Sequence, residues 1–232
     1  MMYQAGNEAE LAAFMEFKSR SLGADRLAYV PVVAGNTRGL VLHYTQNNQK
    51  LNNSDWMLMD AGALYFGYCS DITRSWPLSG RFSDPQARLY EAVLRVQEKC
   101  QLALQTVPGI TFAQFNEVAA YLVACELDAL GFKDVERNVH KWFPHSIGHH
   151  LGLDLHDCPN HDPNAPLIPG NVITIEPGVY VPIDDANAPK EYRGLVIRIE
   201  DDFVIEADGE ITNMTAAVPK TIAAIEQLIR RD

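Results

Sequence analysis

The sequence has few basic residues, no closely spaced cysteines and no long apolar run. Its 232 residues contain 19 Lys and Arg against 30 Asp and Glu, which gives a formal net charge of -11. Nucleic-acid backbones and anionic membrane surfaces repel an acidic protein, so neither is expected as the main partner. No apolar run reaches the roughly 18 residues that a membrane-spanning helix needs.

The cysteine, glycine and proline content narrows the class further. With 47% apolar residues and only 15 Gly and 13 Pro, the chain is neither disordered nor collagen-like. The first six residues show no basic region or apolar stretch of the kind that marks a secretory signal. The cysteines form no CxxC pair, which favours free thiols in a reducing compartment over a disulfide frame or a zinc–thiolate site; they are Cys69, Cys100, Cys125 and Cys158. We therefore expect an intracellular globular protein.

Helical and strand-like patterns alternate along the chain without a long linker. The apolar spacing predicts helices over 8–20, 85–105, 112–130 and 220–230. It predicts strands over 29–33, 39–44, 56–63, 69–76, 172–176 and 195–205. Residues 159–169 and 183–189 are rich in Pro, Asn and Asp and are expected to be loops. Helices gathered on an antiparallel sheet define an α+β domain.

Four acids fall where an isolated carboxylate is costly. Asp60 ends the apolar strand WMLMD, Glu176 ends VITIE and Glu200 ends LVIRIE. Asp71 is expected on the return strand of the first hairpin, where it can face Asp60. An ionised carboxylate taken out of water costs several kcal/mol unless a cation compensates it. A single acid at a strand end is expected to face solvent, but four in similar contexts, with Arg198 as the one obvious local base, favour a multivalent cation.

Histidines gather in the segment PHSIGHHLGLDLH at 144–156. Imidazole is a common metal ligand and moves protons near neutral pH. The first two histidines have the spacing of a zinc-protease helix, but the Glu of HExxH is absent and Gly148 interrupts the pattern. A mixed carboxylate and histidine site, typical of Mn²⁺ or a similarly hard divalent ion and often of an ion pair, is therefore favoured over a three-histidine zinc site. The histidines of the segment are His145, His149, His150 and His156.

Five ordered motifs resemble the catalytic domain of the pita-bread metallopeptidases. They are LHYT at 42–45, MDAGALYFGYCSDITRSWP at 59–77, PHSIGHHLGLDLHD at 144–157, TIEPGVY at 174–180 and RIEDD at 198–202. Within that family the pattern is most similar to Xaa-Pro aminopeptidase (aminopeptidase P). It is most similar there to the mitochondrial branch, which includes the intermediate-cleaving peptidase that trims one residue from imported proteins. The resemblance runs from about residue 8 to the end. It implies the pita-bread fold, a curved antiparallel sheet with helices on its outer face.

The resemblance also implies two divalent metal ions, with Mn²⁺ favoured and Co²⁺ or Zn²⁺ as alternatives. In the family the first Asp serves one ion, the second Asp and the last Glu bridge both, and the His and the remaining Glu complete the other. The residues of this sequence at those positions are Asp60, Asp71, His149, Glu176 and Glu200.

The same resemblance implies hydrolysis of the N-terminal peptide bond by a water molecule made acidic between two cations. Glu176 is expected to carry the proton to the leaving nitrogen. The family's supporting histidines fall on His43, His145 and His156, and the last two are expected to steady the tetrahedral intermediate and the substrate carbonyl. Arg198 shares a strand face with Glu200 and is expected to orient the metal-ligating acids. His150 is expected to pack or to line the pocket and not to bind metal.

Relatives of this kind usually carry a second domain. Residues 1–232 are expected to form a single catalytic domain that lacks the family's N-terminal domain and the first helix of the catalytic domain. The missing domain commonly contributes to dimerisation, so a homodimer is an expectation drawn from the family alone. The expected partners are peptide or protein N-termini as substrates, and the compartment is mitochondrial or cytoplasmic.

Three other functions stay open on the sequence. A prolidase-type dipeptidase shares the EPG and histidine motifs, and only the pocket separates it from an aminopeptidase. Methionine aminopeptidase shares the fold, although LHYT, DITRSWP and LGLDLHD fit it less well. A pita-bread interaction module with weak catalysis is the alternative from a different class, and five intact ligand positions argue against it.

Overall fold

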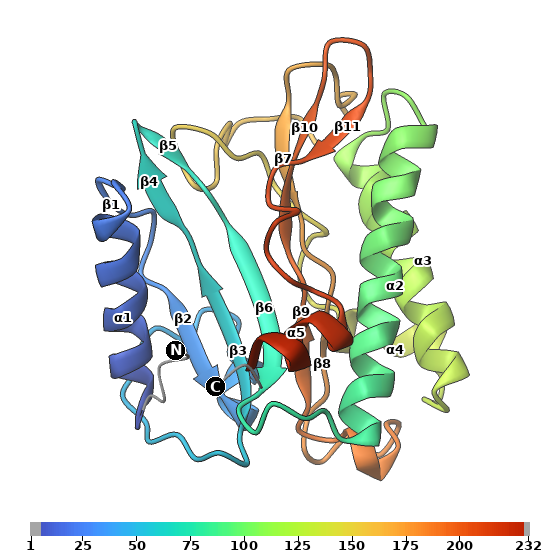
Figure 1. Ribbon diagram of the computed structural model, residues 1–232. Helices are drawn as coiled ribbons and strands as arrows, with labels where there is room; N and C mark the ends of the chain where they lie inside the picture. Colours follow the sequence, from blue (N-terminus) through green and yellow to red (C-terminus); the bar gives the residue numbers. More distant parts are fainter. Residues whose placement is uncertain (1–5, 230–232) are drawn as a thin grey trace.

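Strands occupy the centre of the molecule, and helices lie on both sides of them (Figure 1). The computed structural model describes residues 6–229. The helices are α1 (Glu8–Ser21), α2 (Asp84–Thr106), α3 (Phe112–Ala129), α4 (Val135–Trp142) and α5 (Ile222–Ile229), with short 3₁₀ helices η1 (Asn36–Leu40) and η2 (Lys190–Tyr192). The strands are β1 (Arg26–Leu27), β2 (Val32–Gly35), β3 (Trp56–Ala61), β4 (Ala63–Tyr65), β5 (Tyr68–Cys69), β6 (Ile72–Pro77), β7 (Val172–Ile175), β8 (Gly178–Tyr180), β9 (Val196–Arg198), β10 (Asp201–Ile205) and β11 (Ile211–Asn213).

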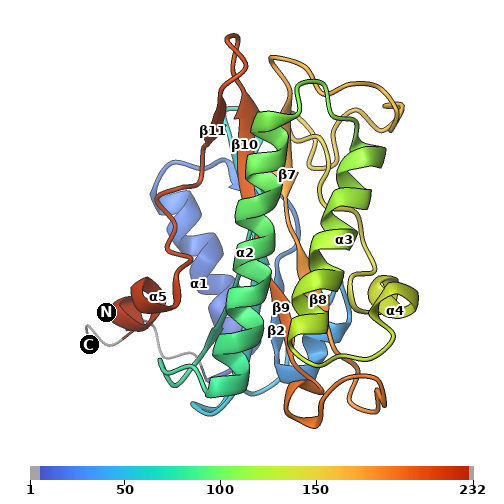
Figure 2. The same ribbon diagram turned by 90° about the vertical axis from the view of Figure 1, so that its right-hand side faces the viewer.

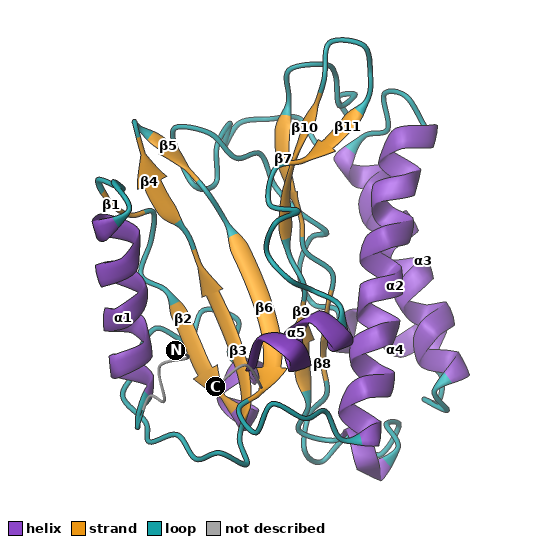
Figure 3. Ribbon diagram, in the orientation of Figure 1, coloured by secondary structure: helices purple, strands orange, loops and turns teal. Residues whose placement is uncertain are grey.

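All strand pairs are antiparallel. The ladders run β2-β3-β6, β11-β10-β7, β8-β9 and β1-β4-β5. The backbone N–H of Glu200 donates to the carbonyl of Thr73 at 3.1 Å, which joins β6 to the junction between β9 and β10. The ladders therefore meet along β6, and the predicted α+β class is confirmed (Figure 3).

The two long helices begin where the sequence predicts. Ser83 and Gln86 form a capping box in front of α2, and Thr111 and Gln114 form another in front of α3. Gly131 follows α3 with a φ of +86°, the left-handed conformation that commonly ends helices. Turned by 90°, α2 and α3 run along the outer side of β7, β8 and β9 (Figure 2). Their apolar faces make the largest core with those strands, so the helices hold one half of the sheet rigidly.

The predicted strand over 39–44 is wrong. The chain forms η1 and a turn there instead. The reason is Glu8, which is fully buried at the start of α1 and whose carboxylate binds side chains from this part of the chain. The Glu8 carboxylate accepts hydrogen bonds from Arg38 Nε at 2.6 Å and from the hydroxyl of Tyr44 at 2.9 Å. A buried carboxylate needs such donors, and satisfying it takes priority over local strand propensity.

Three further strand predictions need correction. The predicted strand over 195–205 is two strands, β9 and β10, separated at Ile199 and Glu200. The predicted return strand over 69–76 is likewise split into β5 and β6, with Asp71 in the gap. Strand 29–33 begins later than predicted, at Val32 directly after Pro31, which has no N–H to give to a ladder.

Helix α4 lies outside the predicted elements. It has only eight residues, too short for its own pattern to stand out, and it is held by tertiary contacts. Trp142 at its end is fully buried, and its indole N–H donates to Asp185 at 2.6 Å. The predicted helix over 220–230 is confirmed as α5, although position 230 lies outside the described residues. Among residues 6–229, no helix is both long and apolar enough to cross a bilayer.

Candidate metal centre

The β3–β6 hairpin brings two of the predicted ligands together. Asp60 lies at the end of β3, directly opposite Thr73. Asp71 precedes β6, so it does not face Asp60 across the ladder as the sequence suggested. The two carboxylates meet instead at the hydroxyl of Tyr29, which bonds to Asp60 Oδ1 and, at 2.5 Å, to Asp71 Oδ1.

A kink in the hairpin produces this arrangement. Ser70 pairs with Ala63 through both its backbone N–H and its hydroxyl. A Cβ on Gly62 would lie 1.7 Å from the carbonyl oxygen of Ser70. Only glycine allows the two strands to approach this closely, and the kink turns Asp71 out of the ladder toward Tyr29.

The third and fourth ligands come from the loop after α4 and from the end of β7. Thr174 donates its N–H to the carbonyl of His149 at 2.9 Å, and Glu176 donates to Ile147 at 2.8 Å, so this loop runs beside β7. The result places His149 Nε2 3.3 Å from Asp71 Oδ2 and 3.7 Å from Glu176 Oε1.

Glu200 enters from the break between β9 and β10. Its Oε2 accepts a hydrogen bond of 2.5 Å from the Thr73 hydroxyl, which in turn accepts one of 2.9 Å from Arg198 Nε. The other end of the Arg198 guanidinium bonds to Asp60 Oδ2 at 2.5 Å. Arg198 therefore contacts one predicted ligand directly and reaches a second through Thr73.

All five predicted ligands lie in one neighbourhood, and three of them are close enough to share an ion. Single ligand atoms of Asp71, His149 and Glu200 lie within 4.8 Å of one another. Asp60 joins this group through Tyr29 and Arg198, and Glu176 joins it through His149. The tight group mixes two buried carboxylates with one imidazole.

Burial makes the negative charge of this centre costly. Burial raises the pKa of Glu176 to about 7, against the charges of Arg198 and His149, which lower it. Burial and the charge of Asp71 raise the pKa of Glu200 well above its usual value, and burial raises that of Asp60. Burial acts to lower the pKa of His149, but its bond to Asp71 and the charge of Glu176 outweigh it and raise that pKa to about 9.

These properties fit divalent cations. Four carboxylates gather where the cationic partners in the described chain are Arg198 and His149. A raised pKa means that these carboxyl groups keep their protons to higher pH, because too little positive charge lies nearby to stabilise the carboxylates. Carboxylates with one imidazole suit a hard or borderline divalent ion, and metal binding would displace those protons.

His145 lies beside the centre but has both ring nitrogens engaged. Arg198 Nη1 donates to the Tyr180 hydroxyl at 2.6 Å, so that hydroxyl is left to donate its own proton to His145 Nε2, 3.0 Å away. Nδ1 then carries the ring proton and donates to the Ser146 carbonyl at 2.8 Å. Burial and the charge of Arg198 lower the pKa of His145 to about 4, which agrees with a neutral ring. The Nδ1 atom is 3.8 Å from Glu176 Oε2.

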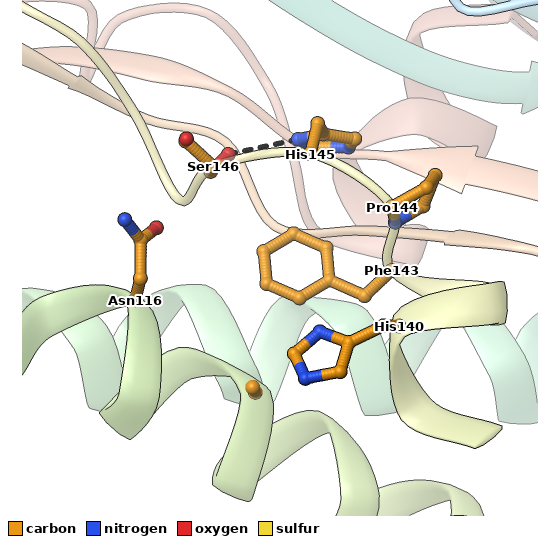
Figure 4. A pocket seen from close by; sticks show the side chains of 7 residues that line it. Asn116, His140, Phe143, Pro144, His145 and Ser146 are labelled. Atoms are coloured by element: carbon orange, nitrogen blue, oxygen red, sulfur yellow. Dashed lines mark hydrogen bonds between the residues drawn. The ribbon is translucent and has the colours of Figure 1, made fainter. Parts of the chain in front are cut away.

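A pocket of about 380 Å³ opens on the helix side of this same segment (Figure 4). Its walls are partly apolar, and it shares His145 with the surroundings of the candidate metal centre. The residues that line it are Asn116, Ala120, His140, Phe143, Pro144, His145 and Ser146.

The remaining predicted histidines, His43 and His156, are exposed to solvent. The rings of His156 and His149 meet edge to face, with centres 4.4 Å apart. Burial and the charge of His149 lower the pKa of His156, and the charge of exposed His43 acts on it in the same direction. Within residues 6–229 neither His156 nor His43 has a hydrogen bond through its ring, which leaves both rings available to a ligand.

Three contributors escaped the sequence reasoning. Tyr29 joins two acids, Tyr180 joins Arg198 to His145, and Thr73 joins Arg198 to Glu200. Tyr180 and Thr73 lie inside motifs already singled out, so their position near ligands was a usable signal. Tyr29 precedes a strand at some distance from any motif, and only the tertiary fold brings it to the centre.

Comparisons with known proteins agree with this geometry. Residues 1–207 match the model of metallopeptidase family M24. The chain is 46% identical to Xaa-Pro aminopeptidase 3 of Homo sapiens over 227 residues, which cover 95% of this chain and 44% of that protein. It is 42% identical over 225 residues to intermediate cleaving peptidase 55 of Saccharomyces cerevisiae, covering 97% of this chain and 44% of that protein.

Solved structures show the same likeness in three dimensions. The crystal structure of Icp55 from Saccharomyces cerevisiae superposes with a TM-score of 0.93 at 40% identity and covers 99% of this chain and 58% of that chain. Zinc-substituted Escherichia coli aminopeptidase P in complex with product gives a TM-score of 0.88 at 34% identity, covering 96% and 52%. This chain thus spans about half the length of the relatives it matches, and within that span it has the pita-bread fold. It belongs to metallopeptidase family M24.

Proposed function

We propose that this chain is the catalytic part of a metal-dependent aminopeptidase that hydrolyses the N-terminal peptide bond. The observation that carries the proposal is the joining of the five ligand positions into one centre, with Asp71, His149 and Glu200 able to share an ion. Similarity to Xaa-Pro aminopeptidase 3 and to intermediate cleaving peptidase 55 across nearly the whole chain supports it.

Two divalent cations would be held by Asp60, Asp71, His149, Glu176 and Glu200. Such ions supply Lewis acidity and lower the pKa of water toward neutrality. We favour Mn²⁺, because four of the five donors are carboxylates and carboxylates suit harder ions. A relative's structure is described as zinc-substituted, so Zn²⁺ is the first alternative.

The chain's own residues would then manage protons and position the substrate. Glu176 would take the proton of the attacking water at its carboxylate and pass it to the leaving nitrogen, a transfer for which a pKa near neutrality is suited. His156, whose ring is free of protein hydrogen bonds within residues 6–229, is the better placed histidine to contact the substrate carbonyl. His145 would act by holding Tyr180, and through it Arg198, in place.

The substrates we propose are peptides with proline in second position or proteins that need one N-terminal residue removed. The names of the relatives support both, and one relative is named a mitochondrial protein, which favours a mitochondrial location over a cytoplasmic one.

Three peptides separate the candidate activities. The Mn²⁺-loaded chain should release the first residue from an Arg-Pro-Pro tripeptide and act slowly on a Gly-Pro dipeptide and on Met-Ala-Ser. Faster cleavage of the dipeptide would favour a prolidase, and preference for the Met peptide a methionine aminopeptidase. Two retained metal ions without hydrolysis of any peptide would contradict the proposal and favour the interaction module. Glu176→Gln should abolish cleavage, while Glu16→Gln, on the exposed face of α1, should not.

A further inference from the structure

A second pair of histidines lies behind the metal centre. His150 is only 7% exposed, and its ring meets that of half-buried His161 edge to face, with centres 4.4 Å apart. Phe112 closes the group from α3, with ring centres 5.2 Å from His150 and 5.8 Å from His161. The sequence analysis assigned His150 to packing or to the pocket wall, and neither ring takes part in the dinuclear centre.

Both Nε2 atoms of this pair are buried without a partner. The atoms have almost no exposed surface, and neither makes a hydrogen bond within the described chain. A buried polar atom left without a hydrogen-bond partner destabilises the folded state. Two such atoms on touching rings are difficult to explain as packing alone, because a phenylalanine would fill the same space without that cost.

The backbone holds the two rings together. Asp157 donates its N–H to the carbonyl of His150 at 2.9 Å, and His161 donates to the carbonyl of Cys158 at 2.8 Å. The loop from 157 to 161 is thereby folded back over His150. Cys158 has a left-handed φ of +52° in this turn.

The local charge favours a cation. Residues 151–171 contain three aspartates and no Lys or Arg. Imidazole nitrogens select Zn²⁺, Cu²⁺ and Ni²⁺ over the harder ions that carboxylates prefer. With Zn–N bonds of about 2.0–2.1 Å, two imidazoles bound side by side on one ion have ring centres about 4.5–5.2 Å apart. The observed distance between the ring centres, 4.4 Å, lies just below this range.

We propose that His150 and His161 form a separate binding site for a single borderline divalent cation of the Zn²⁺ class, with both Nε2 atoms as ligands. Water admitted as the two rings open would fill the remaining coordination positions. Because only two protein ligands are in place, the site binds more weakly than the dinuclear centre. The ion joins the loop that carries His156 to the segment that carries His149. This site does not depend on peptidase activity.

Zinc stoichiometry tests the site. The full chain is dialysed against Zn²⁺ and the bound metal is measured by mass spectrometry, with His161→Phe and His150→Phe as variants that keep an aromatic ring against Phe112. The wild type should bind about one equivalent more than either variant. His140→Phe, which removes an exposed histidine of α4, is the matched control and should bind as much as the wild type.

The comparison of the wild type with His161→Phe is decisive, because His150 adjoins the predicted ligand His149 and its replacement also acts on the dinuclear centre. Equal zinc in wild type and His161→Phe would overturn the site, and so would an equal loss in His140→Phe. If a variant fails to fold, crystals of the wild-type chain soaked in Zn²⁺ decide the matter. An anomalous peak between His150 and His161 is expected, and its absence at full occupancy of the dinuclear centre would refute the proposal.

Discussion

Arg74 and Asp201 form a buried ion pair directly behind the metal centre, with Arg74 Nη2 2.6 Å from Asp201 Oδ1. Each is the chain neighbour of a residue at the centre, Thr73 and Glu200. Arg74 Nη1 also donates to the carbonyls of both neighbours, at 2.9 and 2.6 Å. The pair therefore fixes the backbone from which the Thr73–Glu200 hydrogen bond is made.

Removing Arg74 should unfold the centre. Arg74→Ala leaves Asp201 fully buried with Lys220 as its remaining cationic partner, 2.7 Å away. Breaking a buried pair costs about 3–5 kcal/mol where the remaining charge is uncompensated, so a smaller loss is expected here. Urea denaturation of the metal-free chain measures the loss. The matched control is Arg20→Ala, which breaks the exposed pair with Glu16 on α1 and should cost no more than about 0.5 kcal/mol. Similar losses for both variants would contradict the structural role of the pair.

Thr73 should control how firmly the cations are held. Its hydroxyl donates to Glu200 and accepts from Arg198, so Thr73→Val leaves both groups short of a partner. Loss of a residue that orients a ligand lowers metal affinity about 10- to 100-fold. Competition with a fluorescent chelator measures this. Thr73→Ser keeps the hydroxyl and should restore affinity.

The control for Thr73 is Thr106→Val, since the Thr106 hydroxyl bonds to the carbonyl of Leu102 at an exposed position on α2. Its metal affinity should equal that of the wild type. An unchanged affinity in Thr73→Val would mean that Glu200 keeps its orientation without the hydroxyl.

The sequence predicted the long helices well because their signals are local. Capping residues and the apolar period of α2 and α3 lie within the elements themselves. The strand over 39–44 was wrong for the opposite reason, since Glu8 precedes Arg38 by 30 residues and Tyr44 by 36. The local sequence pattern contains no information about a buried carboxylate that comes from another element.

The candidate ligands could be picked out because the acids interrupt apolar strands, a pattern visible without the fold. Their mutual geometry could not. Asp71 meets Asp60 through the Tyr29 hydroxyl and not across the ladder, and that contact depends on the close approach of Gly62 to Ser70. The roles of paired residues such as His145 likewise depend on Tyr180, which only the folded chain brings near.

Gly148 should tolerate no side chain. A Cβ at this position would lie 2.0 Å from the carbonyl oxygen of Thr174, a backbone atom that is fixed in β7. Gly148→Ala must push the loop away from β7 and carry His149 with it. We expect a cost of about 1–3 kcal/mol or more in unfolding free energy and weaker metal binding. Gly6→Ala, where the nearest atom is 3.6 Å away, is the control and should bind metal normally.

Metal removal should make stability depend on pH in a defined direction. In the metal-free chain the pKa of Glu176 is raised from 4.5 to about 7, mainly by burial. A raised folded pKa means that the folded state holds the proton more tightly, so the stabilising contribution is complete below 4.5 and is lost as pH rises through about 7. His149, raised from 6.5 to about 9, extends the loss in the same direction.

Bound cations take the place of these protons, so the loaded chain should not show this loss. The difference in melting temperature between Mn²⁺-loaded and EDTA-treated protein should therefore grow steadily between pH 4.5 and 7. The effect of His145 on stability has the opposite sign, because its pKa is lowered to about 4. Its burial is common to the loaded and metal-free forms, so this effect largely cancels in the difference.

Among metal-free chains, Glu176→Gln should become more stable relative to the wild type as pH rises over the same interval, since glutamine has no proton to lose. If the melting temperatures of the two metal-free chains change in parallel with pH across that interval, the pKa of Glu176 is not raised. The excess of negative charge that supports a cation site would then reside on Asp60 and Glu200.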